Sequence, residues 1–450
     1  MNEKVKIGIN KLYWSGQRRI LGGDNKIKLK LYPEYMYSGI QWIGKIPKGW
    51  EVKKVKQFSR LFTGSTPDSG NEKYWDGDIT WVTPADLSTQ QKFIKKSKRT
   101  ITREGYDNSG TSFVSTGAII LATRAPIGYP TIVGAKVCFN QGCKAIEIKK
   151  DFIPDYVYYY LNVYVDVLVS KGNATTFCEL SSYDLTSFQV LMPTIQEQTT
   201  IANFLDKKTV EIDALIEKDK KLIELLKEKR TALINHAVTK GLDPNVKLKD
   251  SGIPWIGEIP EGWEVKKLKY LVKDLSGNGF PEEEQGKDVG DIPFYKVSDI
   301  NRSEKFVEIA NNFVSKKTIK DHKWNIIPKY SLIAPKIGEA LKKNHRKITK
   351  VKCIIDNNCI AFHTFDINYN YNYYLFKLIN FEWFVNPGAV PSLSIEKLRS
   401  SIVSLPPLPE QTTIANFLDK RTAKINASIE KIEKKIVLLE EYKKSLNPTF

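Results

Sequence analysis

The sequence predicts an α+β protein built from two similar small domains, each followed by a long helix, with the two helices forming an antiparallel coiled coil. Two observations support this prediction. The decapeptide QTTIANFLDK occurs at 198–207 and again at 411–420, and the segment at 38–56, SGIQWIGKIPKGWEVKKVK, returns at 251–269 with four differences. Both pairs are 213 residues apart (411 − 198 and 251 − 38), so the chain is a tandem duplication of one unit, expected to have pseudo-twofold symmetry.

The duplication divides the chain into consecutive segments. We expect an N-terminal extension at 1–37, a first domain at 38–193, a first spacer helix at 194–240, a linker at 241–250, a second domain at 251–406 and a second spacer helix at 407–450. The extension has only a loose parallel before the second copy. The second helix is expected to be the shorter, because the chain ends before a counterpart of INHAVTKGL.

Inside each domain, short runs of β-branched and aromatic residues bounded by Gly, Pro and Asn predict strands and tight loops. Examples are DITWVTPADL at 78–87, its counterpart DIPFYKVSDI at 291–300, and KVCFNQGCKAIEI at 136–148. The Tyr-rich segment DYVYYYLNV at 155–163 has the apolar spacing of a packed helix. Between the matched segments the two copies have diverged, which suggests a fixed scaffold that carries two domains with different recognition properties.

The segments after each decapeptide have the composition of long helices, rich in Lys, Glu, Leu and Ile. Thr194 and Glu197 have capping-box spacing, Pro409 suits a first turn, and Gly241 marks a stop. Apolar residues recur at steps of three and four, interrupted in the first helix by Asp219 and Arg230; they are Ile212, Ile216, Ile223, Leu226 and Leu233, then Ile425, Ile429, Ile432, Ile436, Leu439 and Leu446. Such a seam requires a partner. The duplicate helix is the simplest partner, and an external partner or a surface face is the alternative.

Charge favours a polyanionic partner, since 69 Lys and Arg residues against 51 Asp and Glu residues give a net charge of +18. A solvated basic surface is the alternative explanation. No run approaches the length of a membrane helix, and the N-terminus has no apolar signal core, so a cytoplasmic location is expected. The five cysteines then stay reduced, and their spacing favours buried thiols over a metal site.

Catalytic signatures are missing from the sequence. There is no G-x-x-x-x-G-K-[ST] loop and no G-x-G-x-x-G turn, and the four histidines stand apart from any nucleophile. The NPTF tetrapeptide at 447–450 has Thr449 where the N-P-P-[YF] loop of adenine methyltransferases has its second proline. The sequence therefore favours a binding protein over an enzyme.

The repeated motifs resemble the specificity subunit of Type I restriction-modification systems. They are the paired P-x-x-x-E-Q-x-x-I-A-x-F-L-D helix starts (from Pro193 and Pro406), the paired I-G-x-I-P-x-G-W-E-V segments, TWVTPADL with FNQGCKAI in the first domain, and PFYKVSDI with APKIGEA in the second. The resemblance covers about 38 to 446. It implies that the two domains are target-recognition domains, each reading one part of a split, asymmetric double-stranded DNA target.

The resemblance also implies the partners and their chemistry. Two modification (methyltransferase) subunits dock on the specificity subunit, and restriction subunits join the full complex. This chain then binds no cofactor and no metal, and S-adenosylmethionine, ATP and Mg belong to the partners. The duplicated decapeptide is expected to present the docking surface; its candidates are Gln198, Ile201, Phe204, Leu205, Gln411, Ile414, Phe417 and Leu418.

Base reading requires Arg, Lys, Asn, Gln, Ser or Thr on loops that can enter a groove. The DNA-binding candidates are Thr66, Arg124, Asn140 and Gln141 in the first domain, and Lys296, Ser298, Lys336, Lys342, Lys343, His345 and Arg346 in the second. A turn or capping role is the alternative for each. The alternative function is a helical adaptor whose two domains bind protein partners.

Overall fold

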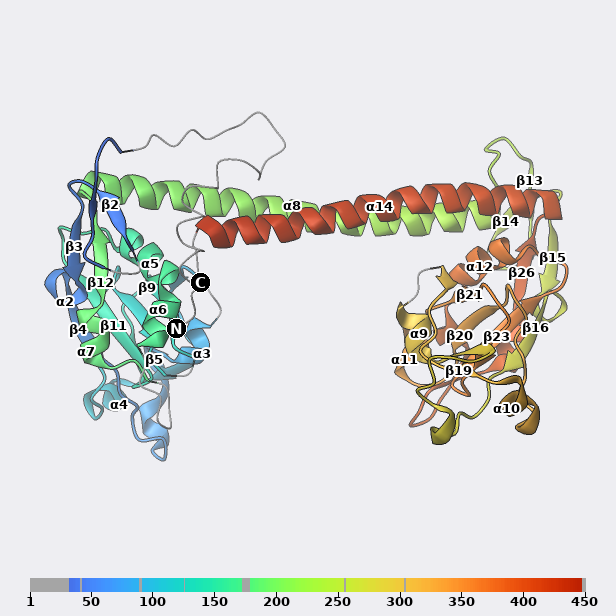
Figure 1. The fold of residues 1–450 in the computed structure, drawn as a ribbon, viewed down its shortest axis with the longest axis horizontal. Helices are drawn as coiled ribbons and strands as arrows, with labels where there is room; N and C mark the ends of the chain where they lie inside the picture. Colours follow the sequence, from blue (N-terminus) through green and yellow to red (C-terminus); the bar gives the residue numbers. More distant parts are fainter. Residues whose placement is uncertain are drawn as a thin grey trace. The chain divides into compact units, whose positions relative to one another are not determined.

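The computed structural model describes residues 32–40, 43–88, 91–124, 126–171, 179–254, 256–302 and 305–446 (Figure 1). The chain divides into two compact units, Met1–Ala214 with Leu439–Phe450, and Leu215–Leu438. Both boundaries fall inside the long helices α8 (Ile195–Lys240) and α14 (Leu408–Leu446). Most of the predicted N-terminal extension and the NPTF tetrapeptide lie outside the described residues.

Unit 1 contains a five-stranded sheet of order β4-β11-β8-β9-β6 and a three-stranded sheet of order β10-β5-β7. In the larger sheet the neighbours pair antiparallel, except for the parallel pair β6 and β9. Two short antiparallel pairs, β1 with β2 and β3 with β12, complete the strands of the described part of the unit. The bounds are β1 Tyr35–Tyr37, β2 Lys45–Pro47, β3 Glu51–Lys54, β4 Ser59–Thr63, β5 Trp75–Val82, β6 Phe93–Ile94, β7 Arg99–Ile101, β8 Ile119–Ala122, β9 Gly128–Val133, β10 Cys138–Phe139, β11 Cys143–Ile148 and β12 Gln189–Met192.

Unit 2 repeats these sheets and pairs as β16-β23-β20-β21-β18, β19-β17-β22, β13-β14 and β15-β26, and it has the additional antiparallel pair β24-β25. The single parallel pair of the larger sheet, β18 with β21, occupies the same place as β6 with β9. The bounds are β13 Leu248–Asp250, β14 Glu258–Pro260, β15 Glu264–Lys267, β16 Val272–Ser276, β17 Ile292–Tyr295, β18 Phe306–Val307, β19 Phe313–Val314, β20 Leu332–Pro335, β21 Lys347–Thr349, β22 Ile354–Ile355, β23 Cys359–Thr364, β24 Val385–Asn386, β25 Ser392–Leu393 and β26 Ile402–Leu405. The predicted α+β fold with two similar domains is therefore confirmed.

Short helices pack around these sheets. In unit 1 they are α2 Val55–Phe58, α3 Pro84–Leu87, α4 Arg103–Asp107, α5 Pro154–Val163, α6 Val165–Ser170 and α7 Ser182–Ser187; in unit 2 they are α9 Val297–Arg302, α10 Lys316–Asp321, α11 Glu339–Lys342, α12 Tyr369–Leu378 and α13 Ile395–Ser400. The Tyr-rich segment forms α5 as predicted, and its counterpart is α12. Tyr159 and Tyr374 lie at equivalent positions of these two helices and are both buried.

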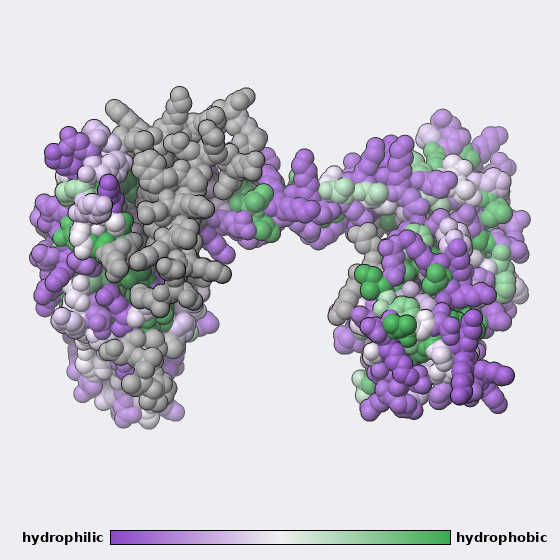
Figure 2. Space-filling view, viewed as in Figure 1, coloured by the Kyte–Doolittle hydropathy of each residue, from purple (hydrophilic) through white to green (hydrophobic). Residues whose placement is uncertain are grey.

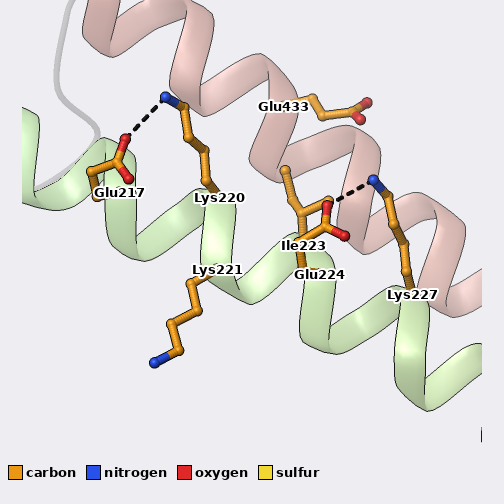
Figure 3. Close-up of a pocket in the computed structure, with 7 residues that line it drawn as sticks. All are labelled: Glu217, Lys220, Lys221, Ile223, Glu224, Lys227 and Glu433. Carbon is orange, nitrogen blue, oxygen red and sulfur yellow. Dashed lines mark hydrogen bonds and ion pairs between the residues drawn. The ribbon is translucent and has the colours of Figure 1, made fainter.

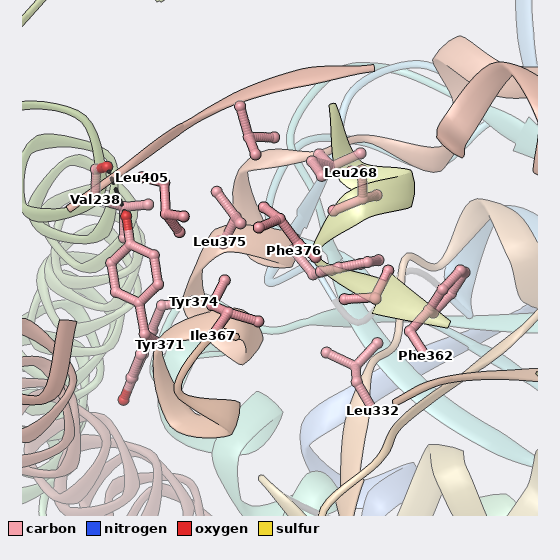
Figure 4. Close-up of a cluster of buried hydrophobic side chains, with 14 of the residues drawn as sticks. Val238, Leu268, Leu332, Phe362, Ile367, Tyr371, Tyr374, Leu375, Phe376 and Leu405 are labelled. Carbon is pink, nitrogen blue, oxygen red and sulfur yellow. Dashed lines mark hydrogen bonds between the residues drawn. The ribbon is translucent and has the colours of Figure 1, made fainter. Parts of the chain in front are cut away.

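The main core of unit 2 extends from its globular domain into both long helices (Figure 4). Phe362, Leu375 and Phe376 pack together inside the domain. The same cluster includes Val238 near the end of α8 and Leu418 near the start of α14. Tyr371 donates a hydrogen bond from its hydroxyl to the Val238 carbonyl at 3.2 Å, so α12 is fastened to α8 by a polar contact within an apolar cluster.

The long helices begin and end at the signals expected from the sequence. Thr194 and Glu197 form the predicted capping box, in which the Thr194 backbone N–H donates to Glu197 at 3.0 Å and the Glu197 backbone N–H donates to the Thr194 hydroxyl at 3.3 Å. Gly241 follows the last residue of α8 with φ of +77°, a left-handed conformation that glycine adopts without strain. Among the described residues, no helix is long and apolar enough to span a membrane.

Helices α8 and α14 pair antiparallel, as predicted. In unit 2, Arg230 donates to the Asn426 carboxamide oxygen at 2.6 Å, while Lys435 donates to Asp219 at 3.1 Å, so residue numbers rise along one helix as they fall along the other. The predicted seam residues Ile216, Ile223 and Ile429 are buried. In Figure 2, the part of the helix pair that is visible in colour is mostly hydrophilic.

The two polar residues that interrupt the seam both have partners on α14. Asp219 is 6% exposed, and the Lys435 ammonium lies 2.8 Å from one of its carboxylate oxygens. A buried charge is tolerated only when it is paired, and such a pair disfavours any shifted alignment of the helices. The Asp219–Lys435 pair therefore fixes the helix register, at a cost in desolvation that apolar residues would not have.

We expect Lys435→Met to lower the free energy of unfolding by about 1–3 kcal/mol, because the substitution leaves the Asp219 carboxylate buried without a partner. Chemical unfolding followed by circular dichroism measures this loss. Lys434→Met is the matched control, since its ion pair with Glu430 is exposed and contributes less than about 1 kcal/mol. Equal effects of the two substitutions would show that Asp219 does not depend on Lys435.

Candidate nucleic-acid interface

Two loops of the first recognition domain, one after β4 and one between β10 and β11, meet at the candidate residues Thr66 and Gln141. The Thr66 hydroxyl donates a hydrogen bond to the Gln141 carboxamide oxygen. The loops can approach because residue 64 is glycine: a Cβ there would lie 2.2 Å from the Asn140 carbonyl oxygen. Gln141 is exposed and Thr66 half-buried, so this pair presents polar groups at one point of the surface.

Asn140 has a turn role in the structure. Its carboxamide oxygen accepts a hydrogen bond from the Gly142 backbone N–H at 3.0 Å. Unit 2 repeats the arrangement, with Asp356 accepting from the Asn358 backbone N–H at 2.7 Å and Gly277 in the place of Gly64. Because both units have this turn, we infer that the Asn140 carboxamide oxygen shapes the loop. The role of its Nδ2 group in base reading remains a prediction.

Arg124 lies at the surface and is paired. Its Nε donates to Glu179 at 3.1 Å, and the ammonium of buried Lys144 lies 3.7 Å from the other carboxylate oxygen of Glu179. Burial lowers the pKa of Lys144, and the Glu179 carboxylate opposes that shift. One carboxylate thus serves two cations, so a DNA phosphate that approached Arg124 would compete with Glu179 for the guanidinium.

The candidates of the second domain are spread over several loops. Lys296 donates to Gln285 at 2.6 Å and stands 4.9 Å from the centre of the Phe280 ring, while Ser298 is exposed on α9. Lys336 is half-buried, and its backbone pairs with Asn358 and Leu393. These residues remain DNA-binding predictions, and the structure does not bring them into one constellation.

The segment Lys342–Arg346 separates into exposed and buried residues. Lys342 and Lys343 are exposed, and Lys342 is paired with Glu339 at 2.7 Å. The prediction that Arg346 contacts DNA is wrong, because this residue is only 2% exposed. Its guanidinium donates to the Asn344 carbonyl at 2.8 Å and stacks 4.0 Å from the centre of the Phe381 ring, so Arg346 holds the loop from inside.

Four of the predicted docking residues are also inside the protein. Gln198 and Gln411 are 2% and 1% exposed, and Ile414 and Leu418 are fully buried. An external partner cannot contact them in this conformation. Phe204 is 37% exposed, whereas Ile201, Leu205 and Phe417 are half-buried, so these four remain docking predictions.

The buried glutamines join each recognition domain to its helix. The Gln198 carboxamide donates to the Pro193 carbonyl at 2.9 Å and accepts from the Ile153 backbone N–H at 3.0 Å. In unit 2 the Gln411 carboxamide donates to the Pro406 carbonyl at 2.8 Å and accepts from the Asn368 backbone N–H at 2.8 Å. The decapeptide is repeated because each domain needs this same internal joint.

A second joint, which was missed in the sequence, is built around a lysine. Lys92 forms an ion pair with Asp206 of α8, and the Tyr159 hydroxyl donates to the same carboxylate at 2.6 Å. In unit 2, Lys305, Asp419 and Tyr374 make the same arrangement, with the Tyr374 hydroxyl 2.5 Å from Asp419. Burial lowers the pKa of Lys305, and burial together with the Asp419 hydrogen bond raises that of Tyr374. The signal available was the dipeptide Lys-Phe, which recurs at 92 and 305 with the same offset of 213 (305 − 92).

Tryptophans of the repeated I-P-x-G-W segment form a third joint. The Trp50 indole N–H donates to Glu197 at 3.4 Å, and the Trp263 indole N–H donates to Glu410 at 3.1 Å. Trp263 is 2% exposed, whereas Trp50 is half-buried. The start of each long helix therefore contacts its domain through three side chains. They are Glu197, Gln198 and Asp206 in α8, and Glu410, Gln411 and Asp419 in α14.

Among the described residues, no group of three or more His, Cys, Asp or Glu side chains could hold a metal ion. A shallow depression on the helix pair is lined by five charged residues of α8, by Glu433 and by Ile223, and its lysines Lys220 and Lys227 pair with Glu217 and Glu224 of their own helix (Figure 3). The four described cysteines are buried and free, as expected, and burial raises the pKa of Cys138 to about 12. Such thiols are poor nucleophiles.

The fold and the site define a class: a duplicated binding protein with two recognition domains that present different loops on one scaffold. The family described as Type I restriction modification DNA specificity domain matches residues 47–225 and again 260–438, and the chain belongs to this family. The two matches are 213 residues apart (260 − 47), the offset of the sequence repeat.

Relatives match over nearly the whole chain. The Type I restriction enzyme MjaIX specificity subunit of Methanocaldococcus jannaschii is 30% identical over 421 residues, which are 90% of this chain and 93% of the relative. The HsdS subunit of Thermoanaerobacter tengcongensis has a TM-score of 0.57 at 13% identity and covers 90% of this chain and 98% of its own. A chain from a structure of a type I R-M system has a TM-score of 0.69 at 13% identity, over 89% of this chain and 97% of its own. These two structures share the fold.

We expect Gln411→Ala to lower the free energy of unfolding by about 2–4 kcal/mol, because the buried Pro406 carbonyl and the partly buried Asn368 N–H lose their partner. Thr413→Ala is the control on the same helix turn, since its hydroxyl is exposed and bonds only to the Pro409 carbonyl of its own helix. Denaturant titration of both variants gives the comparison. If Gln411→Ala is no more costly than Thr413→Ala, the glutamine is not a structural joint.

Proposed function

We propose that this protein is the DNA sequence-recognition subunit of a Type I restriction-modification complex and that it reads a split, asymmetric double-stranded target. The main support for the proposal is that the family model matches the chain twice. The two matched halves share the same joints between domain and helix, but their loops differ. The first domain presents Thr66 and Gln141 at the point where the second has Gly279 and Asn357. Because the loops differ, the two domains read different base sequences, and the target is asymmetric.

The chain contributes recognition, and the chemistry belongs to its partners. Two modification subunits dock on the two halves and supply methyl transfer from S-adenosylmethionine; restriction subunits supply the functions that require ATP and Mg. The docking surface consists of exposed residues at equivalent positions of the two helices. Ile195 and Leu408 are 40% and 55% exposed at the first helical position, 213 residues apart (408 − 195), and Phe204 and Phe417 are the partly exposed aromatic pair.

Mapping methylated adenines across the host genome, with and without this chain, tests the proposal. Deletion should remove one split motif with two different halves and leave other methylated motifs in place. Re-expression of the chain restores that motif, and the purified chain alone should transfer no methyl group to a plasmid that carries it. An unchanged methylation map after deletion would remove the basis for assigning DNA recognition to this protein.

We further propose that α8 and α14 set the number of unread base pairs between the two halves. Adding Leu-Lys-Glu-Ala between Leu222 and Arg230 lengthens α8 by about 6 Å and turns it by about 400°, close to one full turn, so the seam can form again. Base pairs are spaced by about 3.4 Å, so the gap should grow by one or two pairs. Sequencing of methylated sites should show both half-sequences unchanged.

A two-residue insertion at the same place is the matched control. It turns the helix by about 200° and points the seam away from α14, so methylation should be lost and not respaced. Altered bases inside either half with an unchanged gap would show that the helices do not set the spacing.

A further inference from the structure

A group of cations gathers in unit 2 where α12 faces the helix α8. Lys377 lies on α12, Arg230 on α8, and Lys343 and Arg346 belong to the loop that precedes β21. In Figure 1, α12 lies next to the long helices, and the bond between Tyr371 and Val238 confirms this contact. The loop contacts the end of α12, because the Arg346 guanidinium donates to the Ile379 carbonyl and the Asn344 carboxamide donates to Asn380 at 2.6 Å. These residues come from three separate parts of the sequence.

The positive charge of this group is not compensated within the described residues. Arg346 donates only to neutral oxygens, namely Asn344 and the Ile379 carbonyl, and Arg230 donates to the neutral Asn426 carboxamide. Among the parts of the chain that the structure describes, no carboxylate pairs with Arg230, Lys343, Arg346 or Lys377. Elsewhere in unit 2 several lysines, such as Lys305, Lys342 and Lys435, do have an acidic partner.

Burial and the positive charge of this group together lower the pKa values of Lys377 and His345. Desolvation by the surrounding protein, followed by repulsion from Arg346, Lys347 and Arg230, lowers the pKa of Lys377 to about 8. Burial and four cations lower the pKa of His345 below its usual value, and its Nδ1 lies 2.6 Å from Asn301. Repulsion between these like charges is unfavourable in the free protein, and a bound anion would offset it.

In the described part of unit 1, the positions equivalent to Lys377 and Arg230 do not form such a group. Tyr159 and Tyr374 align α5 with α12, and this alignment places Asn162 at the position of Lys377. Lys443 occupies the position of Arg230 at the offset of 213 (443 − 230), but it is paired with Asp213 at 2.6 Å. The cation group is therefore a property of the second half and does not belong to the shared scaffold.

We propose that Arg230, Lys343 and Lys377 form a binding site for backbone phosphates of the DNA strand read by the second domain. The site rests on the proposed function, since it supplies sequence-independent affinity for the DNA that the second domain reads. Exposed Lys343 and Lys377 contact the phosphate oxygens, and Arg230 contacts them from the helix. Buried Arg346 holds the loop that carries Lys343 and adds to the positive potential. The first domain reads its half of the target without this anchor.

Salt dependence of binding tests the site. The complex of the full chain with its modification subunit is titrated onto a duplex that carries the methylated motif, at several KCl concentrations. Lys343→Gln/Lys377→Gln should weaken binding by about tenfold or more and reduce the slope of log K against log salt by about 2, since each lost phosphate contact removes about 0.9. Lys434→Gln, which removes an exposed lysine paired with Glu430, should change neither quantity. Lys343→Arg/Lys377→Arg should keep the slope and shows that charge, and not folding, is measured.

A methylphosphonate scan locates the phosphate. Neutralising one phosphate in the half read by the second domain should weaken the unmodified complex and leave the Lys343→Gln/Lys377→Gln complex unaffected. Neutral phosphates in the other half should weaken both complexes equally. Unchanged salt slopes would overturn the site. The site would also be overturned if the Lys343→Gln/Lys377→Gln variant no longer bound the modification subunit but kept its DNA contacts. That result would indicate that the cations bind an acidic protein surface. If the unmodified complex shows no preference for the motif, the proposed function itself fails.

Discussion

Each half of the protein depends on one buried carboxamide. Gln198 and Gln411 satisfy a backbone carbonyl just before the long helix and a backbone N–H just before the Tyr-rich helix. A buried group of this kind has no access to water, so its partners must keep their geometry. The direction in which each long helix leaves its domain is thereby fixed by two hydrogen bonds, and the glutamate, aspartate and tryptophan contacts around them add further restraints.

This constraint explains why the chain can vary its loops without losing its fold. The glutamine, aspartate and lysine of the joints recur at the offset of 213, the tyrosines Tyr159 and Tyr374 are 215 residues apart, and all lie at the helix side of each domain. The loops after β4 and β16 need only a glycine, Gly64 or Gly277, to pass close to the backbone of the neighbouring loop. Beyond these positions the two copies differ freely, and their strand order remains the same. Recognition can therefore diverge between the halves while the scaffold stays common to both.

The sequence predicted the architecture because its signals are local or repeated. The capping box at Thr194, the glycine stop at Gly241 and the three-and-four spacing of the seam each specify structure within a few residues, and the constant offset relates the halves. The site was predicted less well, because burial depends on tertiary packing. Gln411 and Arg346 are polar residues in polar segments, and nothing in their neighbourhood shows that the fold encloses them. The cationic group around Lys377 was not predicted either, because its members come from three separate segments of the sequence.

The two halves thus share the same joints between domain and helix but differ in how their cations are paired. In the first, Arg124 and Lys144 share one glutamate and Lys443 is paired with Asp213, so these cations are compensated within the protein. In the second, Arg230, Arg346 and Lys377 have neutral or like-charged neighbours among the described residues. Where cations are paired with acidic residues, DNA binding depends mainly on short-range hydrogen bonds to the bases, which vary with sequence. Cations without an acidic partner attract the phosphate backbone of any sequence. A duplicated scaffold can in this way combine one domain governed mainly by base contacts with another that also anchors the duplex.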